Sequence, residues 1–253
     1  MKAFERKEKI IQELHRHKKV LVSQLADSFK VTEETIRRDL EKLEQEGVVT
    51  RNYGGAVLNN HIQDDLPYQM RNTRNIEEKR AIASLLLSLI NDEDTLMTDT
   101  SSTVFEALKL LESERDNLTI ITNSVIILNE FNQTSHTIIS TGGSLRPKAS
   151  SLIGPVARQT IQNYNVDIAL FSCKGISMMS GITDSNEPES ELKQAMSQQA
   201  RQTILLIDSS KFDLIGFVKM LEFKQIRYII TDRKPSDEWI SFLENQDITL
   251  LYP

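Results

Sequence analysis

Apolar residues recur at helical spacing near the start of this 253-residue chain. Ile10 and Leu14 lie four residues apart and predict an amphipathic helix over about residues 5–17. The apolar positions between residues 20 and 29 predict a second, shorter helix, for which Ser23 is the expected N-cap. Two helices joined by a short connection are therefore expected within the first thirty residues.

A third helix follows after a tight turn. Its apolar residues fall on one stripe, formed by Ile36, Leu40 and Leu43. Thr32 is the expected N-cap, and Gly47 is the expected stop. Residues 48–57 then read as two short strands around a glycine turn. Three helices followed by a β-hairpin predict a winged helix-turn-helix domain over residues 1–58.

The pattern changes after a polar stretch at residues 59–75, which contains Pro67 and is the predicted linker. From there on, short apolar strands alternate with helical patterns. The predicted strands are 95–98, 118–121, 137–140, 166–171, 203–207, 227–230 and 248–251. The predicted helices are 76–90, 103–112, 124–131, 152–163, 189–200 and 237–245. This alternation predicts an α/β domain with a mainly parallel sheet over residues 76–253.

Short polar and cationic side chains lie off the apolar stripe of the third helix. Such groups reach base edges and phosphates, and this helix of a helix-turn-helix lies in the major groove. The expected DNA contacts are Ser23, Thr32, Thr35, Arg37, Arg38 and Lys42, with Arg51 and Tyr53 on the hairpin against the backbone or minor groove. The alternative is that the arginine pair is only a solvated helix face. Asp39 is expected to be structural, since a carboxylate would repel phosphate.

Polar loops follow four of the predicted strands, where a parallel sheet binds its ligands. Hydroxyls and backbone N–H groups at helix starts form anion sites, and a glycine pair lets the backbone approach a phosphate. The candidate ligand residues are Asp99, Ser101, Ser102, Thr103, Thr122, Asn123, Gly142, Gly143, Asp208 and Lys211. Lys211 would supply a compensating charge, whereas Asp99 and Asp208 are expected to accept hydrogen bonds from sugar hydroxyls. Alternatively, each segment is an ordinary N-cap or turn.

The charge is unevenly distributed along the chain. The net charge is −6, yet residues 1–60 hold 12 Lys and Arg against 10 Asp and Glu, whereas the remainder holds 18 against 26. This asymmetry fits an N-terminal domain that contacts DNA, followed by an acidic body.

Several classes of protein are excluded or disfavoured. Cys173 is the only cysteine, which excludes an internal disulfide and a zinc finger, and a small buried residue is favoured over a reactive thiol. His15 and His17 cannot share a helix face, so no metal site is expected there, and no cofactor is expected. No apolar run reaches the about 18 residues of a membrane span. Without an apolar N-terminal signal segment, a cytoplasmic protein with no membrane partner is expected.

A signature with fixed gaps runs through the predicted first and third helices. Its positions are Arg6, Ile10, Leu14, Thr32, Thr35, Ile36, Arg37, Arg38, Asp39 and Leu40. This stretch resembles the N-terminal domain of the DeoR family of bacterial sugar-operon regulators. The resemblance implies that residues 1–58 bind double-stranded operator DNA.

Residues 76–232 resemble the C-terminal sugar-phosphate-sensing domain of the same family, a relative of ribose-phosphate isomerases. The similar positions are the loops at 99–103, 122–123, 142–143 and 208–212, with Ser101 in place of the usual glycine. The resemblance implies that these loops bind a phosphorylated sugar.

Two further segments refine this resemblance. Residues 171–176 depart from the common family form, and together with residues 184–186 they look closer to the fucose-operon regulator branch. Lys174 and Asp184 thus join the expected effector contacts, although Lys174 is either a second phosphate cation or a surface residue. The solvated first turn of a helix is expected to hold Glu187, Glu189, Glu191 and Lys193, with a ligand contact as the alternative for Glu187.

Two classes of function follow. The first is a transcriptional regulator, by family a repressor, in which a phosphorylated sugar changes the affinity for operator DNA. A single winged helix covers one half-site, so a homo-oligomer, dimer or tetramer, is expected. The alternative is a sugar-phosphate isomerase-like enzyme with a DNA-binding appendage, which would need a carboxylate base of tuned pKa. The complete N-terminal signature has no role in the enzyme hypothesis and favours the regulator.

Overall fold

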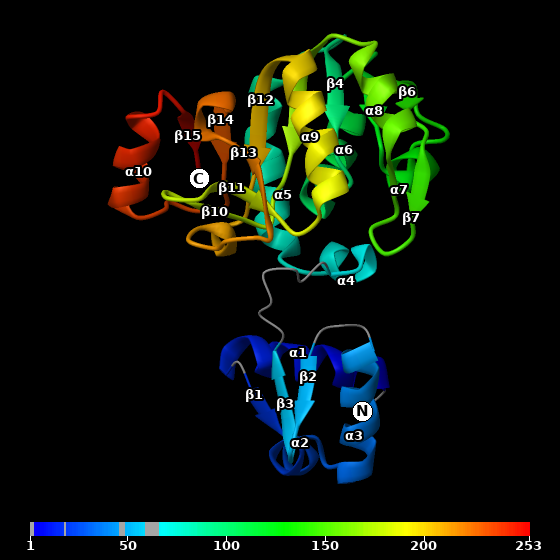
Figure 1. The fold of residues 1–253 in the computed structure, drawn as a ribbon, viewed down its shortest axis with the longest axis vertical. Coiled ribbons are helices and arrows are strands. Elements are labelled where there is room, and N and C mark those ends of the chain that lie inside the picture. The colour runs from blue at the N-terminus through cyan, green and yellow to red at the C-terminus, as the bar shows by residue number, and fades with distance from the viewer. Residues whose placement is uncertain (1–2, 18, 46–48, 59–65) are drawn as a thin grey trace. The chain divides into compact units, whose positions relative to one another are not determined.

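The computed structural model describes residues 3–17, 19–45, 49–58 and 66–253. The chain divides into two compact units, Met1–Leu66 and Pro67–Pro253 (Figure 1). The first unit holds the predicted DNA contacts, and the second holds the predicted ligand loops. Gly47, the expected helix stop, and the side chain of His15 lie outside the described residues.

The first unit is a winged helix-turn-helix, as the apolar pattern predicts. Its elements are α1 (Ala3–His17), β1 (Lys19–Leu21), α2 (Val22–Phe29), α3 (Glu33–Gln45), β2 (Val49–Asn52) and β3 (Gly55–Leu58). The three strands form an antiparallel sheet in the order β1-β3-β2, of which β1 was not predicted. The predicted stripe of α3 is almost fully buried, together with Ile10 and Leu14 of α1. The core of this unit is thus the one that the helical spacing predicts.

The expected N-cap at Ser23 is wrong. The helix α2 begins one residue earlier, and its N-cap is Leu21, which has extended backbone and makes no side-chain cap. The reason lies in the hairpin, because the amide of Val22 donates to the carbonyl of Gly54 at 2.9 Å. A backbone bond to the turn of the hairpin thus satisfies one of the amides that the first turn of α2 leaves without a partner inside the helix. Ser23 is an exposed residue in the first turn of the helix.

The second unit is built on a sheet of seven parallel strands, which the sequence predicts strand by strand. The strand order is β15-β14-β12-β9-β4-β5-β6. The strands are β4 (Thr95–Thr98), β5 (Thr119–Thr122), β6 (Thr137–Ser140), β9 (Val166–Phe171), β12 (Ala200–Leu206), β14 (Tyr228–Ile230) and β15 (Thr249–Leu251). The α-helices between them are α5 (Ile76–Leu86), α6 (Ser102–Glu114), α7 (Val125–Glu130), α8 (Pro155–Gln162), α9 (Glu187–Gln199) and α10 (Asp237–Glu244). Short 3-10 turns occupy Leu87–Leu89, Ser209–Lys211 and Phe223–Gln225.

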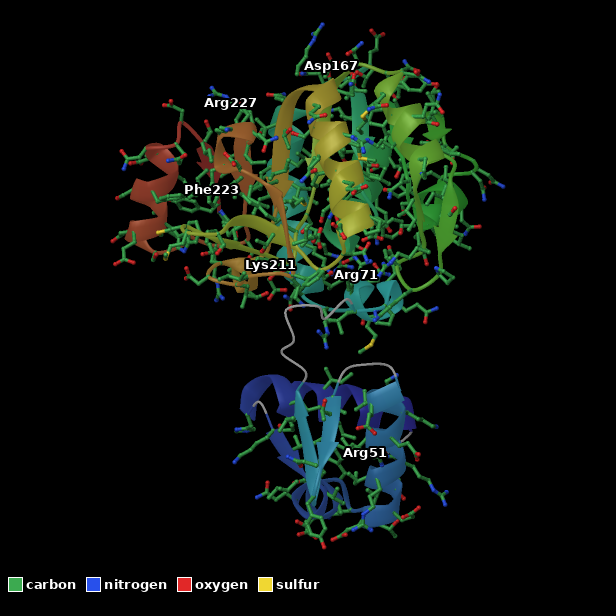
Figure 2. All side chains as sticks on the ribbon, viewed as in Figure 1. Arg51, Arg71, Asp167, Lys211, Phe223 and Arg227 are labelled. Carbon is green, nitrogen blue, oxygen red and sulfur yellow. The ribbon has the colours of Figure 1, made fainter. Side chains whose placement is uncertain are left out.

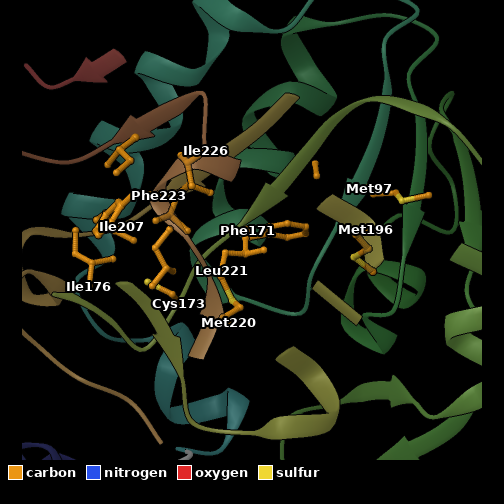
Figure 3. Close-up of a cluster of buried hydrophobic side chains, with 14 of the residues drawn as sticks. Met97, Phe171, Cys173, Ile176, Met196, Ile207, Met220, Leu221, Phe223 and Ile226 are labelled. Carbon is orange, nitrogen blue, oxygen red and sulfur yellow. The ribbon is translucent and has the colours of Figure 1, made fainter. Parts of the chain in front are cut away.

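Helices cover both faces of this sheet. Alternate residues of a strand point to opposite faces, and in β9 Ile168 and Leu170 join a cluster with α5, α6 and α7. Ala169 and Phe171 join a second cluster with α8, α9 and α10 (Figure 3). Figure 1 shows α9 in front of the sheet and α5 and α6 behind it. The central strands are therefore buried on both sides, which explains their uninterrupted apolar sequences.

Smaller elements that the sequence did not predict complete the second unit. They are α4 (Tyr68–Asn72), the antiparallel pair β7 (Ser144–Arg146) and β8 (Ser151–Ile153), and the antiparallel sheet of β10 (Gly175–Ser177), β11 (Gly181–Asp184) and β13 (Val218–Leu221). The helix α4 lies within the expected linker at 59–75, so the structured unit begins earlier than residue 76.

The chain reverses its direction of winding between β4 and β9. After β4 it adds β5 and β6 on one side, and then β9, β12, β14 and β15 on the other. The loops that follow β4 and β9 therefore diverge, and α/β sheets bind ligands at such a point. Figure 2 shows Lys211 and Arg71 at the end of the second unit opposite Asp167 and Arg227, which lie where strands begin. Both cations thus lie at the carboxyl end of the sheet.

Candidate functional site

The helix α3 presents the predicted DNA contacts on its exposed side. Thr32 is the N-cap, since its hydroxyl accepts a hydrogen bond from the amide of Thr35 at 3.3 Å. Arg37, Arg38 and Lys42 are exposed, whereas the apolar stripe faces the core. The helix is therefore held by one side and leaves cationic and hydroxyl groups available on the other.

Within the described residues, each of the two arginines of α3 pairs with a glutamate of the same helix. Arg37 lies 2.7 Å from Glu33, and Arg38 lies 3.3 Å from Glu34, each one turn apart. Exposed pairs of this kind contribute at most about 1 kcal/mol. Because the pairs are weak, either guanidinium can exchange its glutamate for a phosphate or a base at little cost.

Asp39 is structural, as expected. It accepts hydrogen bonds from Nε and Nη2 of Arg6, the latter at 3.2 Å, and both residues are buried. The hydrogen bond to Asp39 raises the pKa of Arg6. The pair joins α1 to α3, and its two members stand at positions of the predicted signature.

The hairpin carries the remaining DNA candidates. The amide and Nε of Arg51 donate to Glu44 of α3, at 2.9 and 2.7 Å, and these bonds lower the pKa of Glu44. Tyr53 stands at the turn before Gly54 and is fully exposed. Arg51 thus fastens the wing to α3, whereas Tyr53 extends into solvent.

In the second unit, Asp99 fastens the two loops that diverge at the switch point. Its Oδ1 accepts a hydrogen bond from the amide of Ser101 at 3.0 Å, and its Oδ2 accepts one from the amide of Ser172 at 3.4 Å. The ammonium of Lys193 lies 2.8 Å from Oδ2. Asp99 is 1% exposed, so a carboxylate, two amides and a cation meet in a buried place.

Lys193 is a central residue of this site, and its predicted place in a solvated turn is wrong. Its Nζ donates to Asp184 at 2.6 Å and to the carbonyl of Ser172 at 2.9 Å, besides its contact with Asp99. Burial alone would lower the pKa of Lys193, but the carboxylates of Asp184 and Asp99 outweigh burial and raise it. Burial would likewise raise the pKa of Asp184, but Lys193 outweighs burial and lowers it. Lys193 and Asp184 therefore both stay charged at neutral pH.

Glu189, one turn before Lys193, is also buried rather than solvated. It accepts hydrogen bonds from the hydroxyl of Ser151 and from Nη1 of Arg146, the latter at 3.2 Å. The face of α9 that carries both residues packs towards the sheet and towards β8. Its polar residues are therefore buried together with Leu192 and Met196.

A second group of charges surrounds Asp208, which follows β12. Its Oδ1 accepts hydrogen bonds from Asn75 Nδ2 at 3.1 Å and from the amide and hydroxyl of Ser210, the amide at 3.1 Å. Lys79 of α5 is 3% exposed, and burial lowers its pKa to about 8, against the opposing charge of Asp208. Lys211 is close enough to lower the pKa of Lys79 further. The two lysines are thus neighbours at the edge of the site.

Arg71 completes the set of cations. It lies in the last turn of α4, its Nη1 donates to the carbonyl of Thr100 at 3.4 Å, and its guanidinium lies over the ring of Tyr68. Its charge lowers the pKa of both Asp184 and Lys79.

Several predicted ligand residues serve the fold. Ser101 is the N-cap of α6, Ser102 donates to the carbonyl of Arg71, and Thr103 is buried in the first turn of α6. Thr122 donates to the carbonyl of Thr98, and Lys174 donates its amide to Thr183 as β10 begins.

The glycine pair also has a structural reason. Gly143 has φ +111, and a Cβ there would lie 2.5 Å from the carbonyl oxygen of Ile153. Gly142 precedes it with φ +63. Gly143 therefore allows the backbone to approach β8, whether or not a ligand also approaches it.

Unsatisfied polar atoms point to a ligand. Within the part of the chain that the structure describes, buried atoms lacking a hydrogen-bond partner include Thr98 Oγ1, Asn123 Oδ1, Asn72 Oδ1 and Arg74 Nη2. Thr98 ends β4, and Asn123 follows the neighbouring β5. Buried polar groups without partners are rare, and a bound molecule is one way to satisfy them.

Sequence reasoning missed Arg71, Lys79 and Lys193. A signal existed for Lys79, which lies three, four and seven residues before the buried Ile82, Ala83 and Leu86, on the same helical stripe. A lysine on an apolar stripe indicates a buried cation.

The chemistry of the site suits an anionic, hydroxyl-bearing molecule. Carboxylates accept from hydroxyls, whereas lysines and arginine attract phosphate. Among the described residues, no group of three or more His, Cys, Asp or Glu side chains could hold a metal ion. Cys173 is buried, and burial raises the pKa of its thiol to about 12, as expected for an inert residue. The described helices include none with the length and apolar character to cross a membrane.

Comparisons with known proteins agree with the sequence signature. Residues 6–61 match the DeoR-like helix-turn-helix domain, and residues 74–233 match the DeoR C terminal sensor domain. The HTH-type transcriptional regulator YulB of Bacillus subtilis is 36% identical over 98% of this chain and 96% of its own length. The L-fucose operon activator of Haemophilus influenzae is 33% identical over 96% of this chain and 97% of its own length. The HTH-type transcriptional repressor GlcR of Bacillus subtilis is 34% identical over 96% and 93%.

Among solved structures, ribose 5-phosphate isomerase A of Methanocaldococcus jannaschii is 15% identical and covers 55% of each chain, with a TM-score of 0.41. The two family matches lie in the two units of the structure, one in each. The full-length relatives are named as transcriptional regulators. The chain therefore belongs to the DeoR family of transcriptional regulators.

Proposed function

We propose that this protein regulates transcription of a carbohydrate operon and that its second unit binds a phosphorylated sugar. The observation that carries the effector class is the gathering of Lys79, Lys193, Lys211 and Arg71 with three aspartates at the carboxyl end of one sheet. Cations of this kind attract a phosphate, and the neighbouring carboxylates accept from sugar hydroxyls. Of the three, Asp208 has the fewest ionic partners and is the best candidate for a hydroxyl contact.

The first unit is the proposed reader of operator DNA. Thr35, Arg37, Arg38 and Lys42 lie on the exposed side of α3, where a helix-turn-helix meets the major groove. Tyr53 is exposed at the tip of the wing, and we propose that it meets the DNA backbone or minor groove. A single unit covers one half-site, so we propose a dimer or tetramer bound to repeated half-sites.

The direction of regulation is proposed as repression that the ligand relieves. One relative is named as a repressor and another as an activator, so the effect of the ligand on operator binding must decide the direction. A ligand that weakens operator binding supports repression, whereas a ligand that strengthens it supports activation or co-repression.

The contacts of the carboxylates favour a sensor over an isomerase. A catalytic base requires a carboxylate with a pKa raised towards neutrality. The pKa of Asp184 is lowered, Asp99 is paired with Lys193, and Asp208 accepts hydrogen bonds from Asn75 and Ser210. Sustained turnover of a sugar phosphate that Asp208→Asn abolishes would overturn the assignment as a regulator alone.

A thermal-shift panel tests the effector class. Phosphorylated sugars are compared with their unphosphorylated counterparts at matched ionic strength. The binding sugar phosphate should stabilise the protein by about 2.7 kcal/mol at a hundredfold excess over its dissociation constant. Equal shifts from the phosphorylated and unphosphorylated forms would remove the argument for phosphate.

A further inference from the structure

The helix α4 is the first element of the second unit. The first unit ends at Leu66, the second begins at Pro67, and α4 spans Tyr68–Asn72. The chain therefore runs from the proposed DNA-binding unit directly into α4. A helix of five residues is too short to be stable alone, and its N-cap makes no side-chain hydrogen bond. The position of α4 therefore depends on its contacts with the rest of the second unit.

Two side chains of the proposed effector site hold the C-terminal end of α4. Lys79 Nζ donates to the carbonyls of Arg71 and Arg74, at 2.6 and 2.5 Å, and Ser102 Oγ donates to the Arg71 carbonyl at 3.2 Å. Arg71 in turn donates to the carbonyl of Thr100. A cation at the last carbonyls of a helix is favourable. These contacts of Arg71, Arg74, Lys79, Thr100 and Ser102 are called the α4 clasp.

The members of the α4 clasp outside α4 lie next to the residues that are expected to meet the ligand. Thr100 and Ser102 flank the N-cap of α6, next to Asp99. Lys79 is buried beside Asp208 and Lys211, and Asn75, four residues earlier, donates to Asp208. A change at Asp99 or Asp208 therefore reaches α4 through one further side chain.

The ammonium of Lys79 has limited capacity. It carries three donors, and the two carbonyls of the α4 clasp occupy two of them. An anion that binds between Lys211 and Arg71 attracts Lys79 Nζ and competes with the weaker, uncharged carbonyl acceptors. A bound anion and the two carbonyls of the α4 clasp therefore compete for the same three N–H donors of Lys79.

We propose that α4 is the output element of the sensor. An anion that engages Lys79 changes the hold of the α4 clasp, and the altered position or order of α4 changes the affinity of the first unit for DNA. This inference rests on the proposed function, since it requires an anion site and DNA binding. A coupling of this kind typically changes affinity about 5- to 150-fold.

Amide hydrogen exchange on the full chain tests the inference without a variant. Exchange is compared in inorganic phosphate and in chloride at equal ionic strength. Phosphate should change exchange at residues 68–75 together with the loops at 99–103 and 208–211. Changes in the two loops with no change at 68–75 overturn the inference but leave the effector site in place. No change in any of the three segments contradicts the anion site and, with it, both proposals.

A matched pair of variants tests the coupling itself. Tyr68 of α4 and Phe131 of the second unit each pack edge-on against the ring of Phe105, both with ring centroids 6.3 Å apart. Tyr68→Leu loosens α4 and removes the ring beneath the Arg71 guanidinium but no charged group, and Phe131→Leu removes an equivalent ring contact away from α4. DNA affinity is measured with and without phosphate, on a fragment selected for binding by the full chain.

The two variants should respond differently. At saturating phosphate, Tyr68→Leu should still bind phosphate but lose most of the phosphate-dependent change in DNA affinity, whereas Phe131→Leu should keep both properties. A full response to phosphate in Tyr68→Leu overturns the proposed role of α4. Equal loss of response in both variants also overturns it, because the effect is then one of general packing.

Discussion

The cations of the two units differ in burial, although they belong to the same residue types. In α3 the side chains of Arg37 and Arg38 are 56% and 73% exposed, and each pairs with one glutamate of its own helix. In the second unit the side chain of Lys193 is 8% exposed and contacts two aspartates and a carbonyl. An exposed pair contributes little and exchanges partners readily, whereas a buried charge that loses its partner costs several kcal/mol.

This difference fits the two proposed roles, since the first unit is proposed to bind DNA and the second to bind a ligand. A helix that binds phosphates and bases benefits from cations whose existing ion pairs cost little free energy to break, as in α3. A site that must keep its shape while a ligand enters gains from charges that are fixed, such as Lys193. Lys79 lies between these cases, since it is buried but balanced by fewer charges, and its pKa is lowered accordingly.

The largest effect is expected from the most heavily paired cation. Lys193→Met leaves Asp99 and Asp184 buried without their cation and should reduce the free energy of unfolding of the second unit by about 3–5 kcal/mol. Urea denaturation measures this loss. Lys219→Met is the control, because Lys219 pairs with Glu222 on the surface and should change stability by about 0.5 kcal/mol or less. Similar values for both variants would remove the distinction between buried and exposed pairs.

Within α3, the same comparison holds between Asp39 and Glu34. Asp39→Asn removes the buried carboxylate that pairs with Arg6 and should destabilise the first unit by about 1.5–3 kcal/mol. Glu34→Gln removes only an exposed partner of Arg38 and should cost about 0.5 kcal/mol or less. Amide exchange of α1 and α3 reports both. If Glu34→Gln proved the more damaging change, the division of α3 into a structural and a recognition side would be wrong.

Arg37→Ala should affect DNA binding rather than stability. A guanidinium that pairs with a base contributes about 1–3 kcal/mol to discrimination, so operator affinity should fall while affinity for random DNA changes less. Filter binding or anisotropy on both DNAs provides the measurement. Arg80→Ala is the control, since Arg80 makes a comparable exposed pair in the second unit. Equal losses on both DNAs would make Arg37 a phosphate contact, and no loss at all would exclude it from the interface.

The smallest effect concerns pH. Burial lowers the pKa of Lys79 to about 8, and the charged groups that act on it are Asp208, Lys211, Glu106 and Arg71. Lys79 is charged below this pKa and neutral above it, so affinity for the phosphate dianion should fall by up to about tenfold per pH unit above pH 8. Titration calorimetry from pH 7 to pH 9.5 measures the slope.

Lys79→Met serves as the reference for this pH dependence. The variant should bind phosphate more weakly at pH 7 and lose the slope above pH 8, because the titrating group is gone. A slope that persists unchanged in Lys79→Met would mean that another group titrates there.

Most of the architecture could be predicted from the sequence because the relevant signals are local. The central strands of the parallel sheet are buried on both faces, and their apolar runs mark them without reference to their neighbours. The short strands β7, β10 and β13 have only three or four residues each, and they exist because a partner strand lies alongside. The predicted N-cap at Ser23 is wrong for the same reason, because the amide of Val22 bonds to the carbonyl of Gly54, which belongs to the distant hairpin.

The site was predictable in part. Asp99 and Asp208 stand directly after strands, so the rule for parallel sheets locates them at one edge. Lys79 and Lys193 lie within helices, where a lysine usually indicates solvent, and only the register of the buried stripe shows otherwise. Which carboxylate binds which cation depends on how α5 and α9 pack against the sheet, and such long-range contacts leave no local pattern.

The affinity of the full chain for operator DNA, measured with increasing concentrations of a sugar phosphate and of the same sugar without phosphate, tests the central claim most directly. The account predicts that the phosphorylated sugar changes the dissociation constant for operator DNA about 5- to 150-fold, and that the unphosphorylated sugar leaves it unchanged. A sugar phosphate that binds the second unit tightly but leaves DNA affinity unaltered would contradict the account.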